Sequence, residues 1–422
     1  MKKYIATILL LSSIAIGQSL SVDECVRIAL ENKPSLKRAE QDVTIARLDR
    51  ANTAATMLPS VNASNSFNET TYGNSSVSSE SYYAGIGLSQ SLFNFGANVQ
   101  QFKLSDTNYN VTKQQRRQAK ARIILDVHTF YYQYLKNSEL FDIAGKDLEL
   151  SKKQLDLVQN QYNLGAVSKT DFLKASVRYG TAKSNFLSRE LSKKNSEKSL
   201  RFSMGLLDSD IEINIEKKMD FILSVPTFDE AYGLMLSNSP DLNILDNQII
   251  TSKLRIKQAW SNGMPNISMS AGINASSADQ LTRGYFDDNY IKNVNITLSI
   301  PIFSGFRNKN NIQIAKLRLD QAETRLRGGT KSAKVSLYAL INTLNNYQEI
   351  IPIQEEVLIS AEEDLKLAQQ KYELGSASIL ELLDAQLALI QASSTLVRTK
   401  YDAAIQVANL DDLLGTLDKK YE

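Results

Sequence analysis

The sequence predicts a mainly α-helical protein with a smaller β portion, built from two structural repeats. Three observations support this fold class: a motif that occurs twice, two very long stretches of helical periodicity, and two stretches in which apolar and polar residues alternate. The motif is Tyr-x-Leu-Gly at 162–165 and 372–375, the helical stretches are about 97–163 and 307–373, and the alternating stretches are about 57–95 and 264–305.

The amino terminus has the features of a secretory signal peptide. Two lysines precede an apolar run from Ile5 to Ile16, and Ala15 and Gly17 supply the small residues of a cleavage site. We therefore expect residues 1–17 to be removed. No later stretch approaches the roughly 20 apolar residues of a transmembrane helix. Cys25 is the only cysteine, which excludes an internal disulfide, and the net charge of +2 gives no reason to expect nucleic acid as a partner.

The repeat extends over nearly the whole mature chain. Its first parts align at an offset of 206 residues, as in Asn32-x-Pro34 and Asn238-x-Pro240, and its later parts align at an offset of 210. The extra residues of the second repeat fall in its Asn- and Ser-rich stretch, where a loop tolerates insertion. The predicted organisation is a first repeat over 18–207, a linker over 208–226 and a second repeat over 227–422.

Each repeat is expected to begin with a helix. A hydroxyl-bearing residue marks its start as an N-cap, and a proline interrupts its course. The N-caps are Ser21 and Thr227, the prolines are Pro34 and Pro240, and the helices end near Thr56 and Asn262.

Four short segments alternate strictly between apolar and small, uncharged polar residues. Each has roughly 9–13 residues, the length and pattern of a strand that crosses an outer membrane with water on its inner side. A soluble sheet of two hairpins with one buried face explains the same pattern and remains an alternative. The segments are 61–68, 82–92, 266–274 and 290–302.

The alternation assigns individual residues to faces. The apolar positions Ile86, Leu88, Ile296 and Leu298 are expected to face lipid, and Gly87, Ser89, Asn295 and Thr297 are expected to face water. The polar connections 69–81 and 275–289 are then expected outside the cell. Four strands cannot close a barrel in lipid, because about eight is the practical minimum. Either the strands are not in a membrane, or several chains share one barrel, in which case three chains would supply twelve strands.

The remaining part of each repeat is predicted to be a long helical hairpin, about 97–205 and 307–415. Narrow apolar stripes in both hairpins favour coiled-coil packing, and Pro352 is expected to kink or break the second long helix. Gly165 and Gly375 are expected to end the ascending helices as C-caps, so they mark the tips of the hairpins. Capping boxes at Ser168–Asp171 and Ser378–Glu381 are expected to start the return helices.

Taken together, these segments resemble the TolC family of outer-membrane efflux and secretion channels. The resemblance covers essentially the mature chain. It rests on the paired repeat, on the hairpin ends "QSLFNFG" and "SIPIFSGF", and on the tips "YNLGAVSKTDFLKA" and "YELGSASILELLDAQ". It implies a homotrimer with a shared twelve-stranded outer-membrane β-barrel, continued by a periplasmic α-helical barrel. A belt at its middle would include the linker 208–226 and the carboxy-terminal end.

The resemblance also implies a function. The chain would be a passive exit duct for efflux or type I secretion, coupled to a periplasmic adaptor protein and to an inner-membrane pump of the RND or ABC type. It would lie in outer-membrane lipid, with a large periplasmic part, and would be gated at its periplasmic tips. The alternative is a periplasmic coiled-coil scaffold or adaptor that forms no pore.

Family members close the periplasmic end with acidic rings, which the resemblance places here at Glu381 and Asp384. It likewise implies a latch between the two hairpins at Asp171 and Tyr372. Ala377 stands where the family often has arginine, and Lys174, the repeat partner of Asp384, is a candidate substitute. Ordinary structural roles explain some of these residues equally well: helix capping for Glu381 and Asp171, and a place in the apolar stripe for Tyr372.

Catalysis has little support in the sequence. His128 is the only histidine and lies in a helical segment, where we expect it to be a packing or surface residue. The sequence has no Ser/His/Asp set, no His/Cys metal cluster and no phosphate-binding glycine loop, so we expect neither an enzyme nor a cofactor.

Overall fold

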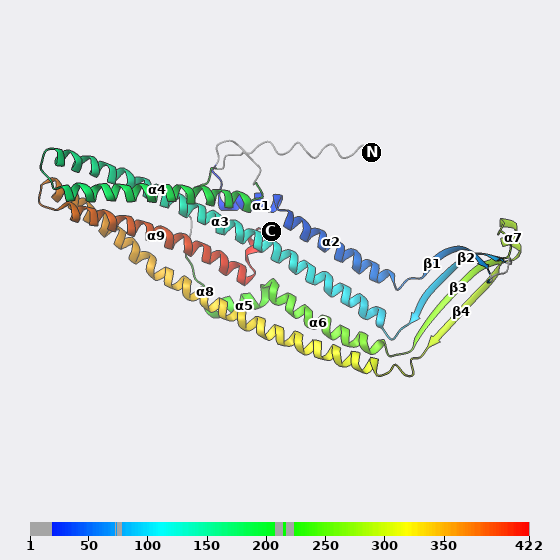
Figure 1. Cartoon of the computed structure of the whole chain (residues 1–422). Helices are drawn as coiled ribbons and strands as arrows, with labels where there is room; N and C mark the ends of the chain where they lie inside the picture. The colour runs from blue at the N-terminus through cyan, green and yellow to red at the C-terminus, as the bar shows by residue number, and fades with distance from the viewer. Residues whose placement is uncertain (1–18, 72, 74–77, 207–213, 217–222, 422) are drawn as a thin grey trace. The chain divides into compact units, whose positions relative to one another are not determined.

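The computed structural model describes residues 19–71, 73, 78–206, 214–216 and 223–421. The expected signal peptide and most of the linker 208–226 therefore lie outside the described residues. The first repeat contributes α1 (Val22–Asn32), α2 (Pro34–Ala55), β1 (Ser60–Thr71), β2 (Ser78–Phe93), α3 (Ala97–Asn163) and α4 (Lys169–Ser203) (Figure 1). The second contributes α5 (Phe228–Asn238), α6 (Pro240–Ser261), β3 (Asn266–Ser277), α7 (Arg283–Asp288), β4 (Ile291–Ser299), α8 (Arg307–Glu373), α9 (Ile379–Leu414) and a short 3-10 helix, η1 (Leu417–Tyr421).

The chain divides into two units, and each draws on both repeats. One unit comprises Met1–Lys37, Arg117–Ser239 and Lys331–Glu422, and it contains both hairpin tips. The other comprises Arg38–Arg116 and Pro240–Thr330, and it contains all four strands.

The first helix of each repeat begins at the expected N-cap. At α1, the Glu24 amide donates to Ser21 Oγ at 3.3 Å and the Ser21 amide donates to Glu24 Oε2 at 2.8 Å, which completes a capping box. Thr227 and Glu230 form the same box at α5. In both repeats a new helix starts at the proline, because the fixed φ of proline suits the first helical position.

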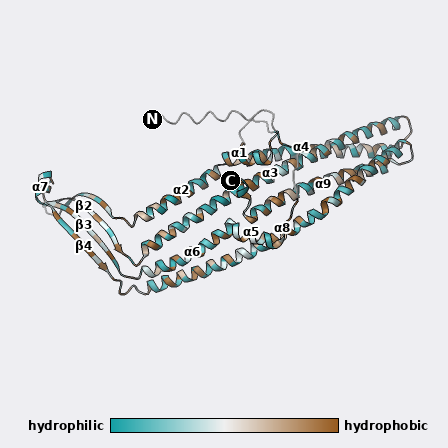
Figure 2. Ribbon diagram, turned by 180° about the vertical axis from the view of Figure 1, so that it is seen from behind, coloured by the Kyte–Doolittle hydropathy of each residue, from teal (hydrophilic) through white to brown (hydrophobic). Residues whose placement is uncertain are grey.

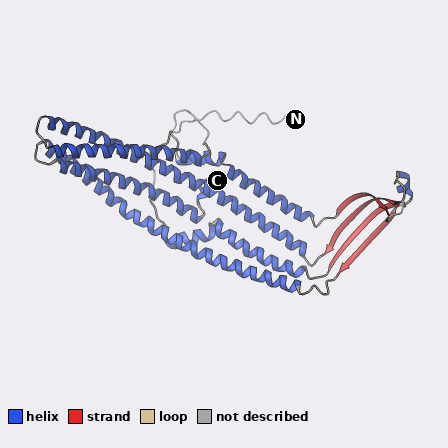
Figure 3. Cartoon of the chain, viewed as in Figure 1, coloured by secondary structure: helices blue, strands red, loops and turns tan. Residues whose placement is uncertain are grey.

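The strands form one antiparallel sheet in the order β1-β2-β3-β4 (Figure 3). The register sets Leu88 opposite Val61 on one side and Ala271 on the other, and Ile296 opposite Met269. Directly paired residues share a face, so one face of the sheet is mainly apolar and the other carries glycine and small polar residues. The polar face includes Asn62, Ser64, Gly87, Ser89, Ser270, Gly272, Asn293, Asn295 and Thr297.

Four expected strand boundaries were wrong: the end of β1, the start of β2, the end of β3 and the end of β4. Residues 69–71 and 78–81 continue the β1-β2 ladder, so the connection is shorter than 69–81, and β3 extends to Ser277 before α7 interrupts the second connection. Polar side chains do not prevent pairing, because the ladder is made by backbone groups. β4 ends earlier than expected, at Ser299, two residues before Pro301, which cannot donate to a ladder.

The two long helices have the expected bounds, 67 residues each. The break expected at Pro352 is absent, because α8 runs through this residue without interruption. A single proline removes one backbone hydrogen bond, and the intact turns on both sides hold the helix together. None of the described helices combines the length and the apolar character needed to cross a membrane, and hydrophilic residues recur along all of them (Figure 2).

The main core of the first unit lies where α1, α3, α4, α9 and η1 meet. Its fully buried side chains include Ile124, Leu135, Leu200, Met204 and Tyr401. His128 packs at its edge: its Nε2 lies 2.8 Å from the Tyr421 hydroxyl, which donates to Asp23 Oδ1 at 2.7 Å. Burial lowers the pKa of His128 to about 4, so the imidazole is neutral and serves packing, as expected.

Candidate functional site

The two hairpin tips lie side by side at one end of the first unit (Figure 1). Each ascending helix ends in a Schellman motif. The Gly165 amide donates to the Tyr162 carbonyl and the Ala166 amide donates to the Gln161 carbonyl, both at 2.9 Å. Gly375 repeats this arrangement, and both glycines have positive φ, 74° and 71°. The predicted turn positions are therefore confirmed.

The return helices have the expected N-cap serines but only half of the expected capping boxes. The Asp171 amide donates to Ser168 Oγ at 3.1 Å, and the Glu381 amide donates to Ser378 Oγ at 3.3 Å. The carboxylates have other partners: Asp171 Oδ2 accepts from Ser168 Oγ at 2.7 Å, and Glu381 Oε1 lies 3.7 Å from Lys371 Nζ. A complete capping box also needs a hydrogen bond from the N-cap amide to the carboxylate. That part of the prediction was wrong at both tips, because the carboxylates take these other partners.

One hydrogen bond joins the two hairpins near their tips. The Tyr372 hydroxyl on α8 donates to Gln161 Oε1 on α3 at 3.1 Å. Burial, and secondly the nearby charge of Asp171, raise the pKa of Tyr372. The charge of Asp171 thus acts on Tyr372, but the hydrogen-bond acceptor of the hydroxyl is Gln161.

An apolar cluster beneath the tips draws on all four helices. Its buried members include Val158 of α3, Ala175 of α4, Leu365 of α8 and Leu382 of α9. Tyr372 packs against this cluster, as its place in the apolar stripe predicts. The two hairpins are thus held together mainly by apolar packing, with few polar links.

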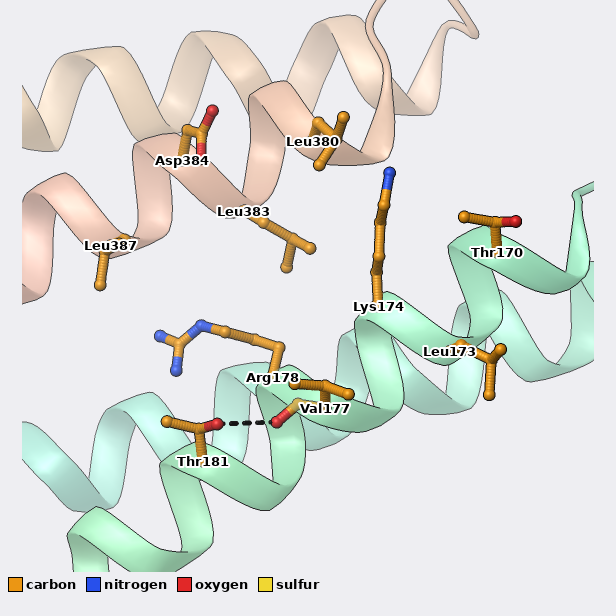
Figure 4. A pocket seen from close by; sticks show the side chains of 10 residues that line it. All are labelled: Thr170, Leu173, Lys174, Val177, Arg178, Thr181, Leu380, Leu383, Asp384 and Leu387. Atoms are coloured by element: carbon orange, nitrogen blue, oxygen red, sulfur yellow. Dashed lines mark hydrogen bonds between the residues drawn. The ribbon is translucent and has the colours of Figure 1, made fainter.

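A groove of about 540 Å³ lies between the return helices α4 and α9 (Figure 4). Its lining is largely apolar, and most of it consists of repeat equivalents, 210 residues apart. These pairs are Thr170 and Leu380, Leu173 and Leu383, Lys174 and Asp384, and Val177 and Leu387. The two repeats therefore present corresponding faces of their return helices to one another across this groove.

The structure separates the two predicted constriction carboxylates. Asp384 lines the groove, whose opposite wall carries Lys174 (Figure 4). Glu381 lies one turn closer to the tip, with its side chain 52% exposed beside Lys371. Both carboxylates are on the first turns of α9, and both residues are exposed.

Sequence reasoning missed a buried ion pair inside the first hairpin. Arg178 of α4 donates to Asp147 of α3, and the two side chains are 15% and 4% exposed. Asp147, Ser151, Gln154 and Val158 follow one another at steps of four, three and four residues on α3, so the spacing marks a packing seam although three of its members are polar. The heptad spacing therefore indicates that Asp147 is buried in a packing seam. Because three residues of the seam are polar, a search for apolar stripes does not find it.

No set of three or more His, Cys, Asp or Glu side chains in the described part of the chain is arranged to hold a metal ion. The tip geometry provides capped turns, exposed carboxylates and an apolar groove. These features suit contacts between helices at the tips and do not suit a catalytic or metal-binding site.

Comparison with known families gives one match that spans most of the chain. The model of a family described as "Outer membrane efflux protein" matches residues 25–206 and 231–416. The two matched segments contain the elements of the first and second repeats.

Individual proteins are similar over nearly the full length. Outer membrane protein TolC of Escherichia coli (strain K12) is 23% identical, covering 96% of this chain and 84% of that protein. Cation efflux system protein CusC of the same strain is 26% identical (92% and 84% covered), and alkaline protease secretion protein AprF of Pseudomonas aeruginosa is 24% identical (93% and 84% covered). A crystal structure of CusC superimposes with a TM-score of 0.81 at 22% identity over 93% of this chain and 92% of that one. The outer membrane protein VceC of Vibrio cholerae gives 0.81 at 17% identity, with 93% and 96% covered.

Proposed function

Because the chain belongs to the outer membrane efflux protein family, we propose that it is a passive outer-membrane exit duct for efflux or secretion. The observation that carries this function is the family match over both repeats, together with the sheet whose two faces differ in polarity. The duct binds no nucleotide, and its coupled pump supplies the energy for transport.

The sheet supports a barrel shared between copies. Within one chain, β1 and β4 are edge strands, and unpaired backbone groups are costly in lipid. Pairing β4 of one copy with β1 of the next satisfies both edges. Three copies give a twelve-stranded barrel, with the apolar face toward lipid and the face of Ser89 and Thr297 toward water.

The partners follow from the same assignment. CusC is named for cation efflux and AprF for alkaline protease secretion. For this chain we propose a periplasmic adaptor and an inner-membrane pump of the RND or ABC type, which engage the periplasmic helical part. The adaptor or scaffold function considered as an alternative is less well supported, because the family match covers both complete repeats, including their strands.

The gate is proposed to lie at the tips. Glu381 and Asp384 from three copies would form two acidic rings around a narrow path, where they attract cations and repel anions. Asp171, Lys174 and Tyr372 would hold the two hairpins together in the resting state. Two observations support this latch: the hydrogen bond from Tyr372 to Gln161, and the charge of Asp171, which helps to raise the pKa of Tyr372.

Membrane fractionation with chemical cross-linking tests the proposal. The mature chain should sediment with outer-membrane markers and cross-link to a trimer, and the purified protein should conduct ions in planar bilayers. A monomer recovered in the soluble periplasmic fraction would favour the scaffold instead.

A further inference from the structure

The helix ends that adjoin the sheet carry a concentrated positive charge. Four helices, α2, α3, α6 and α8, meet the strands (Figure 1). The nine residues of each that lie nearest the sheet include eight basic residues in all and one acidic residue, Asp49. The corresponding nine residues at the tips, on α3, α4, α8 and α9, include four basic and five acidic residues. The net charge of the chain is only +2, so positive charge gathers at the sheet end. The eight basic residues are Arg47, Arg50, Lys103, Lys253, Arg255, Lys257, Arg307 and Lys309.

These four helices form one layer with two open faces. Arg50 Nε of α2 lies 2.8 Å from Asp106 Oδ1 of α3, and Gln258 Nε2 of α6 donates to Gln101 Oε1 of α3 at 2.8 Å. The helices follow the order of the strands that they join (Figure 1). Neighbouring helices therefore cover the sides of each helix, and its remaining surface faces one side of the layer or the other.

The basic residues of α6 divide between these two faces. Lys253, Lys257 and Trp260 follow one another at steps of four and three residues, so they share one face. Arg255 lies two residues from either lysine, about 200° around the helix, and therefore belongs to the opposite face. All four side chains are exposed, Trp260 by 50%. One face of α6 thus has a tryptophan nearest the sheet and two lysines behind it.

The other helices add basic side chains to the face of Lys257. The residues that contact neighbouring helices fix the rotation of each helix, since the helices are right-handed and alternate in direction. This rotation places Lys103 of α3, Lys309 of α8 and Arg47 of α2 on the side of Lys257. Asp49 lies about 200° from Arg47 around α2, on the other side. We call the set of Arg47, Lys103, Lys253, Lys257 and Lys309 the basic face.

The basic face continues the apolar face of the sheet. A register shift between Ser91 and Phe93 brings Phe93 opposite Ile267, on the apolar face. On the helices beyond, the exposed side chains of Val99 and Trp260 carry apolar surface onward, four residues from Lys103 and three from Lys257. Tryptophan favours the boundary between a membrane and water. The lysines therefore lie just beyond that boundary, on the side proposed for lipid.

We propose that the basic face binds the phosphate groups of anionic phospholipids in the inner leaflet of the outer membrane. This inference rests on the proposed outer-membrane duct and specifies the lipid chemistry around its neck. Lys309, Lys257 and Lys103 lie about 3, 6 and 9 Å from the sheet ends of their helices. The headgroup layer beyond the hydrocarbon is about 5–7 Å thick. Flexible lysine stems therefore bring all three ammonium groups to the depth of the lipid phosphates.

The lysines are available for such a ligand. Within the part of the chain that the structure describes, the ammonium groups of Lys103, Lys257 and Lys309 have no hydrogen-bond or ion-pair partner. Like charges at one level repel, and an anionic surface relieves this repulsion. A lysine near such a surface favours binding by about 1 kcal/mol, which is about fivefold. The depth of the face and its tryptophan favour a lipid over a soluble acidic polymer as the ligand.

Trp260 is the only tryptophan, so its fluorescence reports lipid contact beside the basic face. The full chain is reconstituted as the trimer in phosphatidylcholine bilayers that contain a minor fraction of phosphatidylglycerol, with one lipid or the other brominated as a contact quencher. At equal mole fraction, brominated phosphatidylglycerol should occupy the site about fivefold or more in preference to brominated phosphatidylcholine. High salt should reduce this preference, because it screens exposed charges.

Matched variants test the face itself. Lys103→Gln with Lys257→Gln should abolish the preference for phosphatidylglycerol. Arg255→Gln with Arg307→Gln also removes two exposed cations, but from the opposite face, since Arg307 lies two residues from Lys309. This control should keep the preference. Single-channel conductance in the same bilayers shows in each case whether the trimer has inserted.

The possible failures are distinguishable. Equal or absent quenching by the two brominated lipids, in a trimer that conducts, would overturn the lipid site and leave the duct intact. The same holds if the lysine variant keeps the preference or the arginine control loses it equally. Lysine-dependent binding to isolated peptidoglycan without a lipid preference would assign the face to an acidic polymer instead. A chain that does not insert into bilayers would overturn both the lipid site and the proposed duct.

Discussion

Arg117 on α3 and Asp418 in η1 form a two-point ion pair across 301 residues of sequence. Arg117 Nε donates to Asp418 Oδ2 at 2.8 Å, and a second guanidinium nitrogen donates to Oδ1 at 3.1 Å. The same guanidinium reaches the carbonyls of Gly415 and Asn238. Four elements of the two repeats, α3, α5, α9 and η1, therefore meet at one arginine, which fixes the carboxy-terminal segment against the first repeat.

We expect Asp418→Ala to destabilise the protein by about 3–5 kcal/mol, because it leaves a largely buried guanidinium without its carboxylate. The Asp418 side chain is only 1% exposed. The measurement is the thermal loss of helical circular dichroism in detergent. As a control, Glu363→Ala breaks an exposed pair with Lys366 and should cost about 0–1 kcal/mol. Equal effects of the two substitutions would show that the ion pair contributes no more than a surface pair.

Acidification should weaken the fold through His128. Burial lowers its folded-state pKa to about 4 from an ordinary value of 6.5, so between these pH values the unfolded chain binds a proton that the folded chain does not. The stability that neutral, buried His128 gives to the fold is complete above about pH 6.5 and is lost as the pH falls toward 4. The free energy of unfolding should fall by at most about 3 kcal/mol over this range. His128→Gln retains a hydrogen-bonding group near Tyr421 without this titration. A variant that loses as much stability as the parent over this pH range would contradict the assignment.

The two faces of the sheet should differ in accessibility. In outer membranes, cysteines at Ser89 and Thr297 should react with a water-soluble maleimide, and cysteines at Leu88 and Leu298 should not. Leu298→Arg should cost about 2–4 kcal/mol if the site lies near the bilayer midplane. Equal labelling at all four positions would be inconsistent with the barrel.

Removing both tip carboxylates should change ion preference. In planar bilayers, Glu381→Ala with Asp384→Ala should weaken cation selectivity and block by multivalent cations, because the field that concentrates cations is lost. Glu362→Ala with Glu363→Ala, on exposed turns of α8, is the matched control and should leave selectivity unchanged. If selectivity is unchanged in the tip variant while the trimer is intact, the pore role is rejected. Glu381 then has only a local structural role, beside the N-cap and Lys371.

Removing the hydrogen bond between the two hairpins should raise the resting conductance. Tyr372→Phe keeps the ring in the apolar cluster and removes the hydrogen bond to Gln161, so it should raise resting conductance with little effect on ion preference. Gln161→Ala should give the same result. The two changes combined should add little, because both remove one interaction. Fully additive effects would mean that the hydrogen bond does not couple these residues.

The sequence alone determined most of the secondary structure, because the signals for helices and strands are local. The periodicity of 97–163 and 307–373 gave both long helices their bounds, and Gly165 and Gly375 marked the turns because a left-handed C-cap favours glycine. Alternation identified four strands and their faces. A kink or break was expected at Pro352, and the helix does not break there, since one lost hydrogen bond does not outweigh a long intact helix.

Tertiary structure decided which side chains meet. Tyr372 and Asp171 are prominent in the sequence, yet the partner of the Tyr372 hydroxyl is Gln161. The spacing of Asp147 marks a packing seam, but it does not identify Arg178 as the partner. A charged or polar side chain in a helical protein has many partners of similar chemistry within its reach. Its choice depends on the register and rotation of packed helices, and these are set by the summed apolar contacts of residues far apart in the chain.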